Sequence, residues 1–312
     1  MTTTLAQQNV SPDSPDPAAP AVYCRDLVRI YTAEGIEVQA LQGVDLHIAT
    51  GELVAVIGVS GSGKSTLLSI LAGLDRPTAG TAVVDGHDLL RMGRAERMQY
   101  QRFSVGFVWQ QASRNLLDYL TGAENVAMVL ALSGRGGPRS RRGRAAELLD
   151  LLGVASCADR RPAQMSGGEQ QRVAIAVALA NAPAILLADE PTGELDDVST
   201  AEVLAALERV NTETGTTTLI VTHDPEVAGH VRRTIHIRDG RIATETMRRT
   251  VVDEQGRERP VAEEFTVVDR LGRMQIPEQA VMELGLTQRV RLSSEPDHLA
   301  VYPQTDGWRE GA

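Results

Sequence analysis

A short apolar segment that leads into a glycine-rich loop is the feature that most constrains this chain. Leu53–Ile57 is rich in β-branched residues, as expected of a parallel strand that is buried on both faces. Gly58–Ser65 follows with the sequence GVSGSGKS, which fits the pattern G-x-x-x-x-G-K-[ST]. In such a loop the backbone N–H groups surround phosphates, and the next helix presents its positive end to them. The pattern predicts an α/β nucleotide-binding core.

The lysine of this loop stands out in the composition. Lys64 is the only lysine among 31 basic residues, all the others being arginine. A compact ammonium group on a flexible stem differs chemically from a planar guanidinium, so we expect Lys64 to reach the β- and γ-phosphates. We expect the Ser65 hydroxyl to bind Mg²⁺, and Thr66–Leu74 to form a helix packed on the sheet. The residues expected to surround the nucleotide phosphates are Gly58, Ser60, Gly61, Ser62, Gly63, Lys64, Ser65 and Thr66. The alternative is a Gly/Ser-rich turn without a ligand.

Two further apolar segments end in polar side chains. Ala184–Ala188 is followed by Asp189 and Glu190, and Thr218–Thr222 is followed by His223. Open α/β sheets place ligand chemistry at the carboxyl ends of their strands. We therefore expect Asp189 to hold Mg²⁺, directly or through water, and Glu190 to polarise the attacking water. A solvated strand end is the alternative for the acidic pair, and a structural or surface histidine is the alternative for His223.

Met165–Arg172, with the sequence MSGGEQQR, opens a predicted helix about twenty residues before the apolar segment that ends in the acidic pair. Together with the phosphate loop, this segment closely resembles the signature motif of ABC ATPases. The unpaired N–H groups at such a helix start form an anion site. The resemblance implies that Ser166, Gly167 and Gly168 contact the γ-phosphate of ATP bound by a second subunit, so that a homodimer forms two composite sites. It also implies a P-loop NTPase fold with a RecA-like core, an antiparallel β subdomain and a helical subdomain.

Other family elements follow in the expected order. Gly106–Gln110 resembles the Q-loop, which implies that Gln110 contacts Mg²⁺ and the attacking water and couples the site to a membrane partner. Gln111 is an alternative assignment by one position. Pro191–Asp196 resembles the D-loop, which crosses the dimer interface and brings Asp196 to the nucleotide site.

Two ring side chains complete the resemblance. His223 resembles the switch histidine that contacts the γ-phosphate, so the catalytic set is Glu190, His223 and Gln110. Tyr31 fits the aromatic residue that stacks on adenine. A core tyrosine is the alternative for Tyr31.

Within the superfamily, the chain resembles the lipoprotein/macrolide-exporter branch, through Ala40–Val44, Asn115–Leu117 and Glu124–Val126. The resemblance covers Val22–Thr244 and departs at Val177, where arginine is common. It implies an ATPase of the export or mechanotransmission type that drives a separate permease from the cytoplasmic face of the plasma membrane.

Composition agrees with this division of roles. The longest apolar runs fall short of the roughly 18 residues that a spanning helix needs, so we expect the membrane part to be another polypeptide. Residues 1–20 have no basic start or apolar stretch and are expected to be a disordered tail. The formal net charge of −10 argues against a general nucleic-acid binder. Cys24 and Cys157 are too few for a disulfide framework and are expected to be free thiols.

The helical subdomain is expected between Gln110 and the signature segment, since Ala145–Gly153 has a clustered apolar face and a terminal glycine. Arg135–Arg144, just before it, is expected to be a dense basic loop. A solvated loop between helices is favoured for it, and contact with anionic headgroups or with the permease is the alternative.

The C-terminal part is expected to hold a charged linker over residues 245–262 and a small β-rich domain over residues 263–305, with a tail over 306–312. Short strands are predicted at Phe265–Val268, Val290–Leu292 and Leu299–Tyr302, and a helix at Glu278–Leu284 that ends at Gly285. The run from Val268 to Leu286 resembles the AbrB/SpoVT swapped-hairpin fold, whose members form intertwined dimers and often bind DNA. From residue 261 onward, however, nine acidic residues face five arginines, a net of −4. Dimerisation or regulation is therefore favoured over DNA binding, and an ATP-responsive DNA-binding regulator is the alternative.

Overall fold

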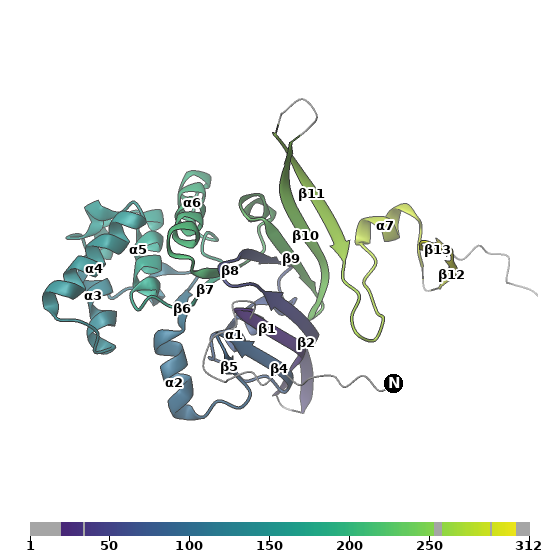
Figure 1. Cartoon of the computed structure of the whole chain (residues 1–312), viewed down its shortest axis with the longest axis horizontal. Coiled ribbons are helices and arrows are strands. Elements are labelled where there is room, and N and C mark those ends of the chain that lie inside the picture. The colour runs from purple at the N-terminus through teal and green to yellow at the C-terminus, as the bar shows by residue number, and fades with distance from the viewer. Residues whose placement is uncertain (1–19, 34, 253–257, 288, 304–312) are drawn as a thin grey trace, which may run out of the picture.

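The apolar strands predicted from the sequence lie side by side in one sheet. The computed structural model describes residues 20–33, 35–252, 258–287 and 289–303 (Figure 1). β3 (Leu53–Ile57) is parallel to β8 (Thr217–Thr222) and to β9 (Arg233–Arg238). β7 (Ile185–Asp189) lies between β8 and β6 (Val105–Val108), parallel to both. The three predicted strands and their parallel arrangement are confirmed, and their carboxyl ends meet at one edge.

The same sheet continues through a stretch that we predicted as a linker, and that prediction is wrong. β10 (Arg241–Val252) and β11 (Glu258–Thr266) form a long antiparallel hairpin, and β10 also pairs with β9. The resulting order is β11-β10-β9-β3-β8-β7-β6. The charges of this stretch are compatible with strands because they pair across them, as in Arg249–Glu263 at 2.7 Å and Arg233–Glu245 at 3.0 Å.

A second, antiparallel sheet forms the predicted β subdomain. Its order is β2-β1-β4-β5, with β1 at Val22–Ala33, β2 at Ile36–Ile48, β4 at Ala79–Val84 and β5 at His87–Asp88. Side chains alternate along β3, so Val54 and Val56 pack toward this sheet and toward α1 (Lys64–Leu71). Ala55 and Ile57 point the other way, into a core shared with α5 (Gly167–Leu179) and α6 (Asp197–Thr214). Both faces of the central sheet are therefore covered, which explains why its strands are almost wholly apolar.

The helical subdomain consists of α3 (Gly122–Leu132) and α4 (Pro138–Leu151), packed against α5. α2 (Arg94–Phe103) lies instead beside the antiparallel sheet, with Tyr100 buried. Short 3₁₀ segments connect these elements at Ala112–Arg114, Ala155–Cys157, Pro162–Gln164 and Pro225–His230.

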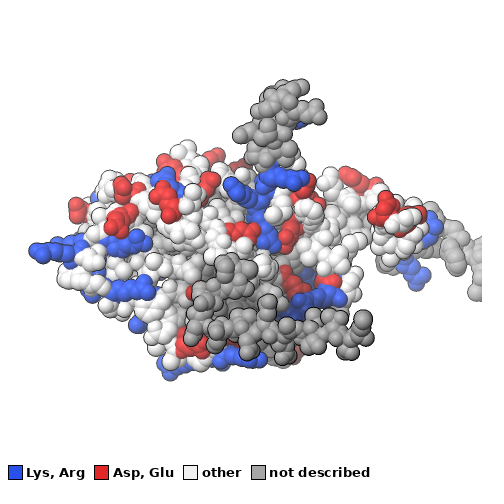
Figure 2. Space-filling model, in the orientation of Figure 1, with Lys and Arg blue, Asp and Glu red and all other residues white. Residues whose placement is uncertain are grey.

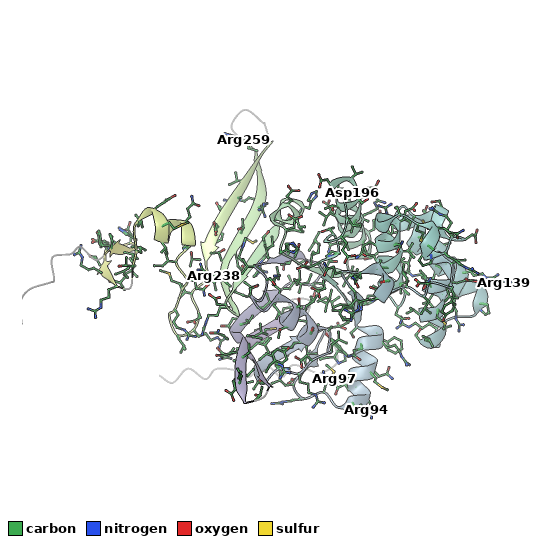
Figure 3. All side chains as sticks on the ribbon, turned by 180° about the vertical axis from the view of Figure 1, so that it is seen from behind. Arg94, Arg97, Arg139, Asp196, Arg238 and Arg259 are labelled. Atoms are coloured by element: carbon green, nitrogen blue, oxygen red, sulfur yellow. The ribbon has the colours of Figure 1, made fainter. Side chains whose placement is uncertain are left out.

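The basic stretch before Ala145 is mostly helix, so the predicted loop is wrong there. α4 begins at Pro138, directly after Gly137, because proline at the first helical position has no N–H to leave unpaired. Figure 2 shows basic side chains at the end of the molecule that carries α3 and α4, and Arg139 points outward there in Figure 3. Whether this surface is merely solvated or contacts headgroups or a permease stays a prediction.

The C-terminal part has the predicted helix and two of the predicted strands. α7 (Glu278–Glu283) is followed by β12 (Val290–Ser294) and β13 (Leu299–Pro303), which pair only with each other among the described strands. The third predicted strand, Phe265–Val268, is instead the end of β11 at Thr266 and a following loop. The predicted tails, residues 1–20 and 306–312, lie outside the described residues except for Pro20. No helix in the described part of the chain combines the length and apolarity needed to cross a bilayer.

Candidate nucleotide site

The phosphate loop connects β3 to α1 and is packed too tightly for side chains at two of its glycines. A Cβ atom on Gly58 would lie 2.3 Å from the carbonyl oxygen of Ile237, and one on Gly63 would lie 2.5 Å from that of Ala40. Gly61 and Gly63 also have positive φ angles of 77° and 103°, which glycine adopts without strain. Ser60 is exposed beside Gly61, and α1 begins at Lys64. Ser65 and Thr66 lie in its first turn.

Lys64 is held inside this loop. Its Nζ atom donates hydrogen bonds to the carbonyl oxygens of Gly58 at 2.7 Å and Val59 at 2.9 Å. Burial lowers the pKa of Lys64, although the nearby Glu190 and Asp189 carboxylates favour its charged form. The buried Ser62 hydroxyl has no hydrogen-bond partner among the described residues. The loop thus combines a buried cation with an unpaired polar group, which suits an anionic ligand.

Two carboxylates lie next to the lysine. Asp189 ends β7, and the Ser65 hydroxyl lies 3.5 Å from its Oδ1 atom. Burial, and then the charge of Glu190, raise the pKa of Asp189. Oxygen ligands with excess negative charge suit a divalent cation such as Mg²⁺, which would relieve this repulsion. The residues present therefore fit the predicted metal.

Glu190 and His223 are brought together from two neighbouring strands. Glu190 Oε2 lies 2.9 Å from His223 Nδ1. Glu190 has a left-handed φ angle of 47°, which is uncommon for a residue other than glycine. Its N–H nevertheless donates to the Val221 carbonyl of β8 at 2.8 Å. The acidic residue is therefore fixed where β7 and β8 end, and the histidine is its partner.

The geometry distinguishes the two glutamines that follow β6. A Cβ atom on Gly193 would lie 3.1 Å from Gln110 Nε2 and 3.4 Å from Glu190 Oε2, so both side chains border Gly193. Gln111 points elsewhere, since its Nε2 atom donates to Glu194 Oε1 at 3.2 Å. The contacts favour the Gln110 assignment over Gln111.

Two residues of the sequence motifs hold this turn through hydrogen bonds that were not predicted. The Asn115 side chain accepts from Trp109 N at 3.0 Å and donates to the Phe107 carbonyl at 2.7 Å. Gln171 of α5 donates to the Trp109 carbonyl at 3.1 Å, which joins the turn to the signature helix. The position of Asn115 shortly after a strand was a sequence signal for this role. The contact between Gln171 and Trp109 gave no local signal, because the two residues are 62 positions apart.

The signature segment does start a helix, as predicted. Ser166 caps α5 by accepting from Glu169 N at 3.2 Å, while Glu169 Oε2 accepts from Ser166 N at 2.9 Å. Arg160, which sequence reasoning missed, bonds Glu169 at 2.6 Å. This hydrogen bond is the main cause of the lowered pKa of Glu169.

The start of α5 packs against the start of α6. Cβ atoms on Gly167 and Gly168 would lie 3.3 Å from Leu195 and 2.9 Å from Ser199. Asp196, which is labelled in Figure 3, caps α6 by accepting from Ser199 N at 2.8 Å. Hydrogen bonds from Ser199 lower the pKa of Asp196. None of the contacts found for the signature residues in the described chain involves the phosphate loop. Within one chain, the structure brings together the loop and the carboxylates but not the signature residues.

Tyr31 lies on β1 with 38% of its surface exposed, so the core-tyrosine alternative is wrong. Its hydroxyl group donates to Asp75 Oδ2 at 2.8 Å, and the Arg29 guanidinium lies 4.2 Å from the ring centroid. Arg29 also pairs with Asp75 at 2.9 Å. The hydrogen bond that holds the Tyr31 ring was not predicted, because Asp75 is 44 residues from Tyr31 in the sequence.

Comparison with known proteins identifies relatives of this chain. Residues 41–193 match the family described as ABC transporter. The chain is 44% identical over 223 residues to the lipoprotein-releasing system ATP-binding protein LolD 2 of Caulobacter vibrioides, covering 72% of this chain and 96% of that protein. It is also 44% identical over 223 residues to the macrolide export ATP-binding/permease protein MacB of Syntrophobacter fumaroxidans, covering 71% of this chain but 31% of that protein.

Solved structures give the same picture. The dimeric ATP-binding cassette MJ0796, in a post-hydrolysis state bound to ADP and Pi, matches with a TM-score of 0.65 and 40% identity. The match covers 72% of this chain and 97% of that one. The chain spans about a third of the length of the MacB relatives and nearly the whole of LolD 2.

Proposed function

This chain belongs to the family of ABC transporter ATP-binding proteins, in the branch that includes LolD and MacB, and from that premise we propose that it binds and hydrolyses ATP to drive a separate membrane permease. The observation that supports this best is the cluster at the carboxyl edge of the sheet. There Lys64, Ser65, Asp189, Glu190 and His223 lie together within one chain.

The phosphate loop is proposed to hold the triphosphate. Lys64 now bonds two loop carbonyls, and in the complex its ammonium group bonds the β- and γ-phosphates instead. Ser65, Asp189 and Gln110 are the proposed Mg²⁺ site, and the ion supplies charge stabilisation to the phosphates. Tyr31 is proposed to stack on the adenine ring, held in place by Asp75 and Arg29.

Glu190 is proposed to polarise the attacking water. Its carboxylate already shares a hydrogen bond with His223, which positions it and also contacts the γ-phosphate. Gln110, at the same glycine, completes the set around the water. Preorganised groups of this kind lower the barrier because little reorganisation is needed when charge develops.

The signature residues are proposed to act on a second copy. Ser166, Gly167 and Gly168 form a helix start that presents N–H groups, and none of their contacts among the described residues reaches the phosphate loop of their own chain. Two chains arranged face to face place each signature segment on the other chain's ATP, with Asp196 near the seam. ATP binding then closes the dimer and hydrolysis opens it.

The permease is proposed to dock in a groove of about 450 Å³ between α2, α3 and α5. Met98 of α2 and Leu132 of α3 line it with 53% and 68% of their surfaces exposed. Val177, the departure from the family pattern, lines it too and makes it more apolar. Because the groove also includes Phe107 of β6, movement at Gln110 can pass to the partner at the inner face of the plasma membrane.

The C-terminal part is proposed to be an AbrB/SpoVT-like dimerisation or regulatory segment. Leu271, Met282 and Leu292 are 76%, 69% and 58% exposed, so the segment covers little of its own apolar surface. A second copy would cover it, and the acidic balance disfavours DNA. A truncation after Thr266 tests this, since a cut at Thr244 would divide β10. In the absence of nucleotide, a truncated protein that self-associates like the full chain would contradict the proposal.

Replacement of the proposed catalytic carboxylate tests the function as a whole. Glu190→Gln should lower ATP turnover by about 10²-fold or more while ATP is still bound. The variant should then stay as a closed dimer, measured by light scattering with Mg²⁺ and ATP. Glu208→Gln, on the exposed side of α6, is the matched control. A Glu190→Gln variant that hydrolyses ATP at the parent rate would refute the assignment.

A further inference from the structure

The C-terminal segment is in contact with the nucleotide-binding core close to the phosphate loop. Val267 N donates to the Ala243 carbonyl of β10 at 2.9 Å, which continues the β10–β11 pairing by one residue. Beyond it, Gln275, Ile276 and Pro277 line a cavity of about 480 Å³ together with Gly58 and Val59. Residues more than two hundred positions apart therefore form one wall beside the phosphate loop.

The turn between β9 and β10 lies between these two parts. Gly240 N donates to the carbonyl of Ser62, in the phosphate loop, at 3.0 Å. The Gly240 carbonyl accepts from Gln42 N of β2 at 2.8 Å. A Cβ atom on Gly63 would lie 3.5 Å from Gly240 Cα, so the turn packs directly on the loop. Displacement of Gly240 would therefore strain or break its hydrogen bond to the Ser62 carbonyl.

Arg241, the next residue, bonds the C-terminal segment. Its Nη1 atom lies 3.5 Å from Asp269 Oδ2, and its Nη2 atom lies 3.4 Å from Gln42 Oε1. Asp269 closes a tight turn by accepting from Leu271 N and Arg273 N, both at 2.9 Å. The hydrogen bond from the Arg273 backbone is the main cause of its lowered pKa, so Asp269 is charged at neutral pH. A second pair, Arg270–Asp45 at 3.8 Å, lies beside the first.

We propose that Arg241 is a positioning residue for ATP binding, because it joins the C-terminal segment to the phosphate loop through Asp269 on one side and Gly240–Ser62 on the other. This inference rests on the proposed function. It assigns the regulation of ATP binding to the C-terminal segment of the same chain. Attachment of the segment favours the loop conformation that binds phosphate. By linkage, bound nucleotide tightens the attachment of the segment by the same factor.

The same cavity supports a role beyond packing. The Gln275 side-chain oxygen is buried without a hydrogen-bond partner among the described residues, so this contact is not fully satisfied as it stands. Buried polar atoms without partners are costly, and a small rearrangement at the cavity can pair them.

The first test uses the full chain without nucleotide. Arg241→Gln and Asp269→Asn should both speed hydrogen exchange in the peptides that contain Gly240 and Ser62. Arg291→Gln, which removes an arginine of β12 that stacks on Tyr302, is the control and should leave these peptides unchanged. Unchanged hydrogen exchange in both Arg241→Gln and Asp269→Asn would overturn the proposal, whether or not the protein hydrolyses ATP.

The second test measures ATP hydrolysis by the same variants. Each single substitution should raise KM by about two- to five-fold, the size expected of one partly exposed ion pair, with kcat within about two-fold. The double variant should raise KM by less than the product of the two single effects, because both substitutions remove the shared Arg241–Asp269 pair. Asp269→Glu, which keeps the carboxylate, should restore most of the parent KM. Additive effects in the double variant, or an unchanged KM, would overturn the proposal.

Discussion

The central sheet and the C-terminal segment use similar apolar residues with opposite results. Ile185, Leu186 and Leu187 of β7 are wholly buried, because helices cover one face of the strand and α1 with the antiparallel sheet covers the other. Leu292 of β12 and Leu299 of β13 are 58% and 50% exposed in a two-stranded sheet. Burial stabilises by about 25 cal/mol per Å² of apolar surface. The sheet can therefore hold a site in place by itself, whereas the segment depends on surfaces outside its own hairpin.

The largest expected effect comes from exchanging one basic side chain in each region. Lys64→Arg should lower kcat by about 10²–10³-fold, because a planar guanidinium cannot take the place of an ammonium enclosed by the loop carbonyls. Arg291→Lys in the segment should change kcat by less than about two-fold, since exposed charges far from a site contribute little to it. Initial rates of phosphate release measure both. Equal losses of kcat in the two variants would contradict the functional difference between the two regions.

Removing one leucine from each region sharpens the comparison for stability. Leu187→Ala should lower the free energy of unfolding by about 2–5 kcal/mol, since it leaves a cavity in a packed core. Leu292→Ala should change it by about 0.5 kcal/mol or less in dilute protein. Urea titration followed by circular dichroism gives both values. A large loss for Leu292→Ala would mean that the segment is already packed against a partner surface.

The smallest expected effect concerns the acidic pair. The pKa of Asp189 is raised above its ordinary value of 3.8 in the folded protein, so its ionisation costs stability as pH rises through the folded value. Without Mg²⁺, Asp189→Asn should therefore be more stable than the parent at neutral pH, and this gain should vanish below about pH 3.8. Asp297→Asn, in the segment, is the control. Thermal unfolding across pH measures both, and an equal gain from the two substitutions would contradict the account.

Much of the nucleotide site could be predicted because its residues come in short local patterns. The loop before Lys64 and the cap at Ser166 are each specified within eight residues, and β3, β7 and β8 are built around apolar runs. The ends of parallel strands then fix which loops meet. The metal and nucleotide roles of these residues remain predictions that the variants above test.

The remainder depends on contacts between distant segments. The sequence of β10 and β11 predicts a linker because these charged strands have no apolar alternation. What places them in the sheet is the backbone pairing of β10 with β9 and β11, which no local pattern indicates. The support of Tyr31 by Asp75, and of Ser62 by Gly240, joins residues 44 or more positions apart. Gly137 and Pro138 indicate the start of α4, but the many arginines around them favoured the prediction of a basic loop.

The most direct test of the central claim is calorimetry of Glu190→Gln with ATP, with and without Mg²⁺, beside the same protein carrying Lys64→Ala. Mg²⁺ and ATP are expected to bind with one nucleotide per chain and to drive dimer formation, and Lys64→Ala is expected to abolish both. Well-folded Glu190→Gln protein that shows no heat of ATP binding with Mg²⁺ would contradict it.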